Sequence, residues 1–174
     1  YVHDYTEFEI LGRTRDDAAG EAFDKIARVL GLGYPGGPKI EKLAKEGNPI
    51  YKLPKTHFED SLDFSFSGIK TAVINLNHNT PNINKADLCA SFQKAVTEVL
   101  VENVVQAIKQ TGIKKVVLAG GVSANTHIRS EFEKLEQKGI KIYKPDLKLC
   151  GDNAAMIGSA GYYRYLNGDL SENT

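Results

Sequence analysis

The stretch that most constrains the fold runs from Lys114 to Asn125 and reads KKVVLAGGVSAN. Its apolar run VVLA is short and rich in β-branched residues, which is typical of a buried parallel strand. Gly120 and Gly121 end this strand, and Ser123 and Asn125 are favourable N-cap residues for a following helix. The stretch therefore predicts a strand, a tight glycine turn and a helix in direct succession.

A turn of this kind can serve as a binding site. Glycines lack the Cβ atoms that would keep a ligand away from the backbone, and a helix N-terminus offers unpaired N–H groups to an anion. In open α/β sheets, ligands bind at this edge of the sheet. The same pattern also fits a tight turn that binds nothing, so it predicts a site without identifying a ligand.

Composition and charge exclude several classes of protein. With 174 residues, 41% of them apolar and 25% charged, the chain is suited to one soluble globular domain or two small ones. Its 22 basic and 22 acidic residues cancel, which argues against nucleic-acid binding through gross positive charge but leaves a local basic patch open. With no signal peptide and no long apolar run, we expect a cytoplasmic protein.

The cysteines and histidines do not form a recognisable metal or disulfide pattern. Cys89 and Cys150 lie far apart and have no CxxC partner, so neither a disulfide framework nor a zinc site is indicated. The four histidines are scattered, with no HxxxH or HExxH pair. A metal site built from the histidines of this chain alone is therefore not expected.

The N-terminal region predicts a strand followed by a helix. EFEILGR, from Glu7 to Arg13, places its apolar residues as a strand does. Thr14 and Asp17 have the spacing of a capping box, which predicts a helix from about Arg15 to Leu32. One side of this helix is acidic, as a solvated face would be, but it also carries Gly20, which costs a helix about 1 kcal/mol relative to alanine.

The next segment contains a second glycine turn. GLGYPGGP, residues 31–38, leads into a helix that ends near Gly47, and its start is a second candidate ligand contact. Residues 48–61 predict a loop or a hairpin insertion. FSFS, residues 64–67, alternates as a strand does, and its last serine can cap a helix from Gly68.

The C-terminal half alternates helices and strands. A long helix is predicted from Lys85 to Thr111, with Gly112 at its C′ position, and a further strand from Ile140 to Lys144. The last helix is predicted over Asp152–Leu166, and its position alone favours Asp152 as the N-cap. This order of elements predicts an α/β fold, with one mixed sheet and helices on both faces.

Five segments together resemble the TsaD family, in the family's order and over nearly the whole chain. The segments are DDAAGEAFDK (16–25), YPGGP (34–38), FSFSGIKTAV (64–73), LAGGVSAN (118–125) and DNAAMIG (152–158). The family comprises the bacterial tRNA adenosine threonylcarbamoyltransferases, with archaeal and eukaryotic relatives in the KEOPS complex. Its older name is O-sialoglycoprotein endopeptidase. One segment alone would be unspecific, whereas the five together are specific.

The resemblance implies an ASKHA fold, shared with sugar kinases, actin and Hsp70-type ATPases, in which two related subdomains enclose a nucleotide. It implies transfer of the threonylcarbamoyl group from threonylcarbamoyl-adenylate to the exocyclic amine of the adenosine beside the anticodon, in tRNAs that read ANN codons. It also implies one iron or zinc ion held by two histidines and one aspartate. The implied partners are tRNA and, in bacteria, TsaB-like and TsaE-like subunits, without a membrane.

The resemblance also implies roles for five residues. Asp24 resembles the family's aspartate on the adenosine side, and Gly37 and Glu41 resemble its contacts from the glycine turn and the next helix. Asn125 resembles the polar contact after the GGV turn. Asp152 resembles the third metal ligand, which replaces the N-cap interpretation of this residue. Carboxylates such as Asp24 and Glu41 can accept hydrogen bonds from ribose hydroxyls or an amine.

One departure from the family limits what this chain can do alone. The family's metal histidines form an HxxxH motif in an N-terminal half, and this motif does not occur here. The resemblance therefore implies that residues 1–174 are the C-terminal part of the enzyme: an ASKHA subdomain with a mixed sheet flanked by helices. It would retain one of three metal ligands, too few to hold a transition metal tightly, and be inactive as an isolated fragment.

The same segments can be assigned to other functions. The chain could be a non-catalytic nucleotide-binding or scaffold fragment that meets its partners but turns nothing over. The metalloglycoprotease of the family's older name finds no support, because no HExxH motif and no Ser/His/Asp grouping is evident. A sugar or acetate kinase would share the glycine turns, but that interpretation leaves FSFSGIKTAV without a role.

Overall fold

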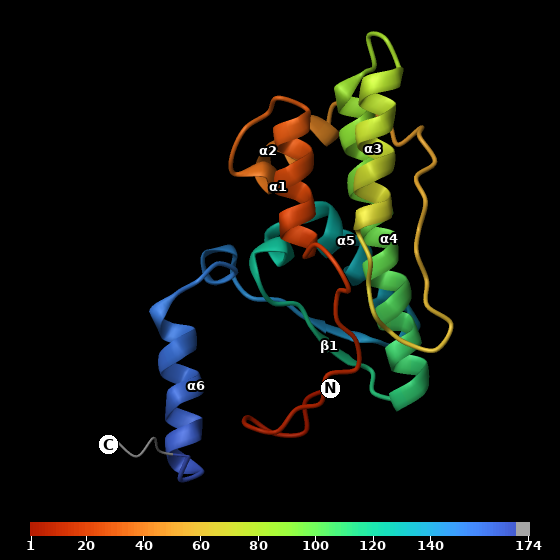
Figure 1. Ribbon diagram of the computed structural model, residues 1–174. Coiled ribbons are helices and arrows are strands. Elements are labelled where there is room, and N and C mark those ends of the chain that lie inside the picture. Colours follow the sequence, from red (N-terminus) through yellow and green to blue (C-terminus); the bar gives the residue numbers. More distant parts are fainter. Residues whose placement is uncertain (170–174) are drawn as a thin grey trace.

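The described part of the chain, residues 1–169 of the computed structural model, consists of helices around a small parallel sheet (Figure 1). The helices and strands follow in this order: α1 (Ala19–Val29), α2 (Gly36–Ala44), α3 (Ser67–Asn79), α4 (Lys85–Thr111), β1 (Lys115–Val117), α5 (Thr126–Glu133), β2 (Lys141–Tyr143) and α6 (Ala154–Leu166). Short 3-10 turns lie among them: η1 (Gly121–Ala124), η2 (Lys134–Lys138) and η3 (Leu147–Leu149). None of the described helices is both long enough and apolar enough to cross a membrane. The predicted α/β class is confirmed.

The long helix α4 packs against α2, α3 and α5. Its boundaries are those predicted, because both of its ends carry strong local signals. The Asn84 side chain accepts hydrogen bonds from the backbone N–H groups of Ala86 and Asp87, at 2.9 and 3.4 Å. Gly112 ends the helix with a left-handed φ of 72°, which costs glycine little.

Helices α1, α2 and α3 pack with the first half of α4 to form the larger of two apolar cores. The rings of Phe23 and Phe92 meet edge to face, with centroids 5.0 Å apart and planes at 70°. Burying such a side chain contributes about 1.5–3 kcal/mol, so this core fixes α1 and α2 firmly on α4. Other fully buried members are Ile26, Leu30, Ile40, Ile69, Val73 and Val96.

The sheet lies over the second, smaller core. β1 and β2 pair in parallel with Val116 opposite Ile142, and both side chains pack against this core together with Phe132 of α5. A parallel pair requires a crossover connection, which η1, α5 and η2 provide. The opposite face of the sheet is open to solvent, since Val117 is 70% exposed.

Two predicted strands are reduced to single bridges. In Glu7–Arg13, Phe8 pairs only with Val2, in an isolated antiparallel bridge, and the predicted strand is wrong. The FSFS segment likewise makes one parallel bridge, between Thr14 and Phe64. A strand needs a neighbour along its whole length, and neither segment has one within the described residues.

Helix α1 is shorter than the predicted Arg15–Leu32. It begins at Ala19, with Ala18 as its N-cap, and ends at Val29. The predicted capping box is wrong, because the Thr14 hydroxyl donates a hydrogen bond to the carbonyl of Asp17 (2.9 Å) instead of receiving one from a helix N–H. The two residues stabilise a turn before the helix, which leaves the neighbouring carboxylates available for other contacts.

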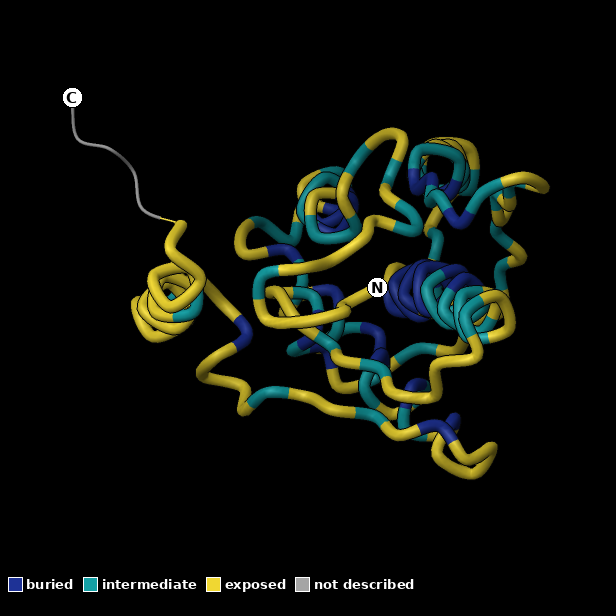
Figure 2. The backbone as a smooth tube through the Cα atoms, turned by 90° about the horizontal axis from the view of Figure 1, so that it is seen from below, coloured by how far each residue is buried: buried dark blue, intermediate teal, exposed yellow. Residues whose placement is uncertain are grey.

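The last helix also differs from the predicted Asp152–Leu166. It begins two residues later, and its cap is Asn153, whose side-chain oxygen accepts a hydrogen bond from the third helical N–H at 3.0 Å. Asp152 precedes the helix and is exposed. Figures 1 and 2 show α6 standing apart from the other helices, and none of its residues is buried. The ring of Tyr163 in α6 stacks on the ring of Tyr5, with centroids 3.8 Å apart.

Candidate functional site

A cavity of 360 Å³ lies where the N-terminal halves of α1 and α2 meet the η1 turn and the start of α5. All four residues that the sequence assigned to the nucleotide line it: Asp24, Gly37, Glu41 and Asn125. These residues come from three separate segments of the chain. The structure therefore brings the predicted set together, while its contact with a ligand stays a prediction.

Asp24 reaches from α1 to the first turn of α2. Its Oδ1 atom accepts a hydrogen bond from the backbone N–H of Gly36, at 2.7 Å. Pro35, the N-cap residue of α2, provides no side-chain cap, so the carboxylate of Asp24 takes that role from a neighbouring helix. The hydrogen bond uses one oxygen, and the other has no partner among the described residues.

Glu41 makes the corresponding contact between α2 and α5. Its Oε1 atom accepts a hydrogen bond from the backbone N–H of Thr126 (2.9 Å) and another from the Thr126 hydroxyl. The side chain is 15% exposed, and the Nζ atom of Lys45 lies 3.7 Å from the same oxygen. The carboxylate thus accepts a hydrogen bond from a backbone N–H that would otherwise be unpaired at the start of α5. Its Oε2 atom has no partner within the described residues.

Asn125 has a structural role that the sequence also anticipated. Its Oδ1 atom accepts a hydrogen bond from the backbone N–H of Ile128 at 3.0 Å, which makes it the N-cap of α5. Its Nδ2 atom donates to Oε1 of Gln93 in α4 at 2.8 Å, and the residue is 7% exposed. Asn125 therefore fixes the glycine turn to α4 while it lines the cavity.

The glycines at the cavity differ in what surrounds them. A Cβ atom on Gly37 would meet nothing within 4 Å, so this residue leaves open space in the cavity wall. A Cβ atom on Gly36 would lie 2.6 Å from the Cα atom of Asp24, so that glycine is required for packing. Gly20 is explained by the structure as well, because its Cβ would lie 3.3 Å from the Val122 side chain of η1. It lets α1 approach the glycine turn.

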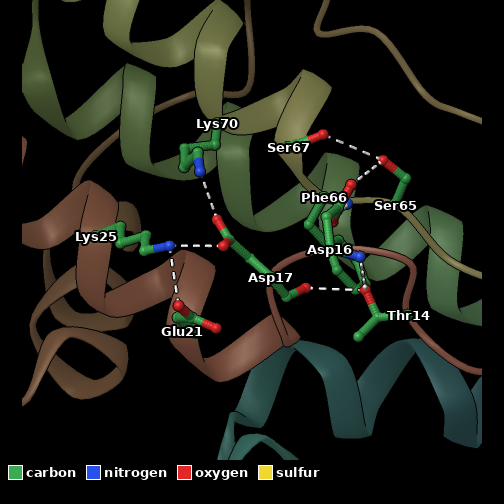
Figure 3. A network of polar contacts seen from close by, with 9 residues as sticks. All are labelled: Thr14, Asp16, Asp17, Glu21, Lys25, Ser65, Phe66, Ser67 and Lys70. Atoms are coloured by element: carbon green, nitrogen blue, oxygen red, sulfur yellow. Dashed lines mark hydrogen bonds and ion pairs between the residues drawn. The ribbon is translucent and has the colours of Figure 1, made fainter.

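Beside the cavity, Asp17 lies between two lysines (Figure 3). Its carboxylate oxygens lie 2.6 Å from Nζ of Lys25 and 2.5 Å from Nζ of Lys70. The hydrogen bonds from Lys25 and then Lys70 hold the pKa of Asp17 below its ordinary value. Conversely, Asp17 and Glu21 raise the pKa of Lys25. The network joins the start of α1 to α3.

Asp16 binds the FSFS segment to the turn that precedes α1 (Figure 3). It accepts hydrogen bonds from the Ser65 hydroxyl (2.5 Å) and from the backbone N–H of Phe66 (2.9 Å). Burial acts to raise the pKa of Asp16, but these hydrogen bonds outweigh it and the pKa lies below its ordinary value. Sequence reasoning missed these partners, although the adjacent aspartates and the serines of FSFS were visible as polar residues beside apolar runs.

Asp152 does not line the cavity. It lies in the exposed connection between η3 and α6. Within residues 1–169, no three His, Cys, Asp or Glu side chains are grouped so that they could hold a metal ion. The residues present therefore do not fit an iron or zinc ion by themselves, since such sites need at least three protein ligands.

Comparison with known protein families gives a match over most of the chain. The family model described as "tRNA N6-adenosine threonylcarbamoyltransferase", named TsaD, matches residues 1–159. A protein of that name from Clostridium perfringens is 55% identical over 179 residues, covering 99% of this chain and 53% of the relative. One from Clostridium botulinum (strain 657 / Type Ba4) is 55% identical over 175 residues, covering 97% and 52%. The chain spans about half the length of these relatives.

Solved structures support the fold. Full-length HypF in its phosphate- and nucleotide-bound form superposes with a TM-score of 0.66 and 23% identity, covering 86% of this chain and 20% of HypF. HypF from T. kodakarensis gives a TM-score of 0.68 and 22% identity, covering 88% and 20%. These likenesses concern the fold alone, and they agree with a subdomain of helices around a sheet. The predicted sheet was mixed, whereas the two described strands pair in parallel.

Proposed function

Because the chain belongs to the TsaD family of tRNA N6-adenosine threonylcarbamoyltransferases, we propose that it supplies the C-terminal part of such an enzyme. In this proposal, the complete enzyme transfers the threonylcarbamoyl group of threonylcarbamoyl-adenylate to the exocyclic amine of an adenosine in tRNA. The cavity between α1, α2 and η1 is one wall of the site for the adenylate. The observation that carries the proposal is the convergence of Asp24, Gly37 and Glu41 on that cavity.

The cavity has features suited to an adenylate. Phe23, Pro38 and Val122 provide apolar surface for a flat purine, and Gly37 leaves space for it to approach the backbone. The Oδ2 atom of Asp24 and the Oε2 atom of Glu41 can accept hydrogen bonds from ribose hydroxyls or from an amine. The chain's own residues therefore bind and orient the nucleotide in this proposal.

The metal and the partner subunits belong to the complete enzyme in this proposal. Asp152 would be one ligand of the iron or zinc ion, and the remaining ligands would come from the part of the relatives' length that this chain does not cover. TsaB-like and TsaE-like subunits would be its partners, and the cytoplasm its location. Because only one of the expected ligands is present, we expect the isolated chain to be catalytically inactive and to act at most as a weak nucleotide binder.

The glycoprotease alternative is not favoured, because the relatives that this chain matches over about half of their length are named as transferases. A non-catalytic scaffold remains the expected behaviour of the isolated chain and not of the complete enzyme. An assay of threonylcarbamoyl transfer by a protein as long as the relatives distinguishes an enzyme from a non-catalytic scaffold.

The experiment is a transfer assay with the complete protein, threonylcarbamoyl-adenylate and tRNA. Gly37→Val should nearly abolish transfer, because a branched side chain would fill the space beside the nucleotide. Asp152→Ala should do the same while the fold is kept. Lys42→Ala, an exposed change on α2 outside the cavity, is the control and should retain activity. Normal transfer by Gly37→Val would place the nucleotide elsewhere.

A further inference from the structure

The side chain of Arg129 in α5 connects two parts of the chain that the proposed function requires to be held together. Its Nε atom donates a hydrogen bond to the carbonyl of Ser123 in η1, at 2.5 Å. Its Nη2 atom donates to the carbonyl of Pro145 at 2.8 Å and contacts Sγ of Cys150 at 3.1 Å. One guanidinium group thus joins the cavity's glycine turn to the segment that follows β2.

The segment on the far side of this bridge leads directly to Asp152. Within residues 145–153, the other hydrogen bonds are local: the Cys150 thiol donates to the carbonyl of Asp146 (3.6 Å), and Asn153 donates to that of Gly151 (3.0 Å). Among the described residues, Arg129 provides the hydrogen bonds that join this segment to the body of the fold. Cys150 is only 4% exposed, although its neighbours toward α6 are exposed.

The chemistry of arginine suits this role. A guanidinium group is planar, always charged, and presents its N–H groups in a fixed fork, so it can satisfy acceptors on two sides at once. A lysine at the same position has one flexible ammonium group and cannot reproduce the spacing of the fork. The bonds that Arg129 makes to carbonyl oxygens are charge-assisted and therefore stronger than neutral ones.

We propose that Arg129 is a positioning residue that holds the segment carrying Asp152 at a fixed place relative to the nucleotide cavity. The effect of Arg129 on catalysis rests on the proposed function. Its effect on the position of the segment, which we call the structural content of the proposal, does not. The residue touches neither the cavity interior nor Asp152. It acts through Ser123 on one side and through Pro145 and Cys150 on the other.

The two cysteines of the chain make the structural content directly testable. Cys89 is fully buried in the larger core and Cys150 is buried beside Arg129, so both should react slowly with a thiol reagent in the wild type. In Arg129→Ala and Arg129→Lys, labelling of Cys150 should accelerate by about tenfold or more, as expected when charge-assisted hydrogen bonds are lost, while Cys89 stays slow. Arg164→Ala, which removes an exposed arginine paired with Asp169, is the matched control and should change neither rate.

The outcomes separate the alternatives. Unchanged labelling of Cys150 in both Arg129 variants would overturn the proposal. Equal acceleration of both cysteines in both variants would also overturn it, because Arg129 would then support the whole fold. Cys89 therefore acts as an internal measure of global unfolding, and Arg129→Lys remains informative if Arg129→Ala fails to fold.

The catalytic meaning is tested in the complete protein by comparing kcat with KM for threonylcarbamoyl-adenylate. Arg129→Lys should lower kcat by about tenfold while KM changes less, because the cavity walls remain and the position of Asp152 is lost. A raised KM with unchanged kcat would assign Arg129 to the cavity alone and overturn the proposal. If the wild type itself shows no transfer, the proposed function fails, and the labelling result still decides the structural content.

Discussion

The region around the cavity and the region after β2 differ in how completely this chain stabilises them. α1 and α2 bury their apolar sides in the core that they share with α3 and α4. A carboxylate from a neighbouring helix accepts a hydrogen bond from a backbone N–H at the start of α2, and a second carboxylate does so at the start of α5. By contrast, α6 buries no residue and exposes Ile157 (66%) and Tyr165 (63%). This chain alone therefore orders the wall of the cavity, which is the proposed nucleotide site, whereas the segment with Asp152 depends on few contacts.

The largest expected effect is on the free energy of unfolding, which should depend on the core around α4 but not on α6. Phe92→Ala removes a fully buried ring from the larger core and should lower the free energy of unfolding by about 3–5 kcal/mol. Tyr162→Ala, in α6 and 58% exposed in the wild type, should change it by no more than about 0.5 kcal/mol. Urea denaturation measures both. A comparable loss in the two variants would show that α6 is packed in solution.

Two neighbouring glycines at the cavity should differ in how much stability an added methyl group costs. Gly36→Ala places a Cβ atom 2.6 Å from the Cα atom of Asp24 and should cost about 1–3 kcal/mol through overpacking. Gly37→Ala points into open space and should alter stability by less than about 1 kcal/mol. Thermal or urea unfolding of the pair checks this. Equal stability of the two variants would mean that α1 and α2 are less closely packed than described.

The acid dependence of stability tests the network beside the cavity. The pKa of Asp17 is lowered by Lys25 and Lys70, so the stability it contributes is present above its unfolded pKa of 3.8 and is lost as the pH falls below that value. Asp17→Asn should therefore be less stable than the wild type at about pH 6, with the difference shrinking toward about pH 3. Glu136→Gln, an exposed change, is the control. A difference that does not depend on pH would argue against these ion pairs.

Local signals predicted some parts of the fold and of the site. The boundaries of α4 follow from Asn84 and Gly112, which act on backbone groups a few residues away. The four cavity residues were assigned through glycine turns and the TsaD resemblance, and the structure gathers them. The helix ends can be read from sequence because the interacting groups are close along the chain. The cavity residues lie in separate segments and could be assigned only because each stands in a motif that resembles the TsaD family.

Contacts between distant segments were not predicted. Glu41 and Thr126 are 85 residues apart, and Asp17 and Lys70 are 53 apart, so no local pattern reveals them. The capping-box interpretation of Thr14 and Asp17 was wrong for the same reason, since the carboxylate of Asp17 binds Lys70 of α3 as well as Lys25 of α1. The predicted strand over Glu7–Arg13 also depended on a distant partner, which is missing from the described residues.

A calorimetric titration of the chain with ADP at millimolar concentration tests whether a nucleotide binds in this cavity. The wild type should bind weakly, because one wall of the site leaves the nucleotide partly exposed and loses desolvated contacts. Gly37→Val should show no binding, because its side chain fills the open space in the wall while the fold is kept. Equal binding by the two proteins would contradict this prediction, because the nucleotide would then bind away from the cavity.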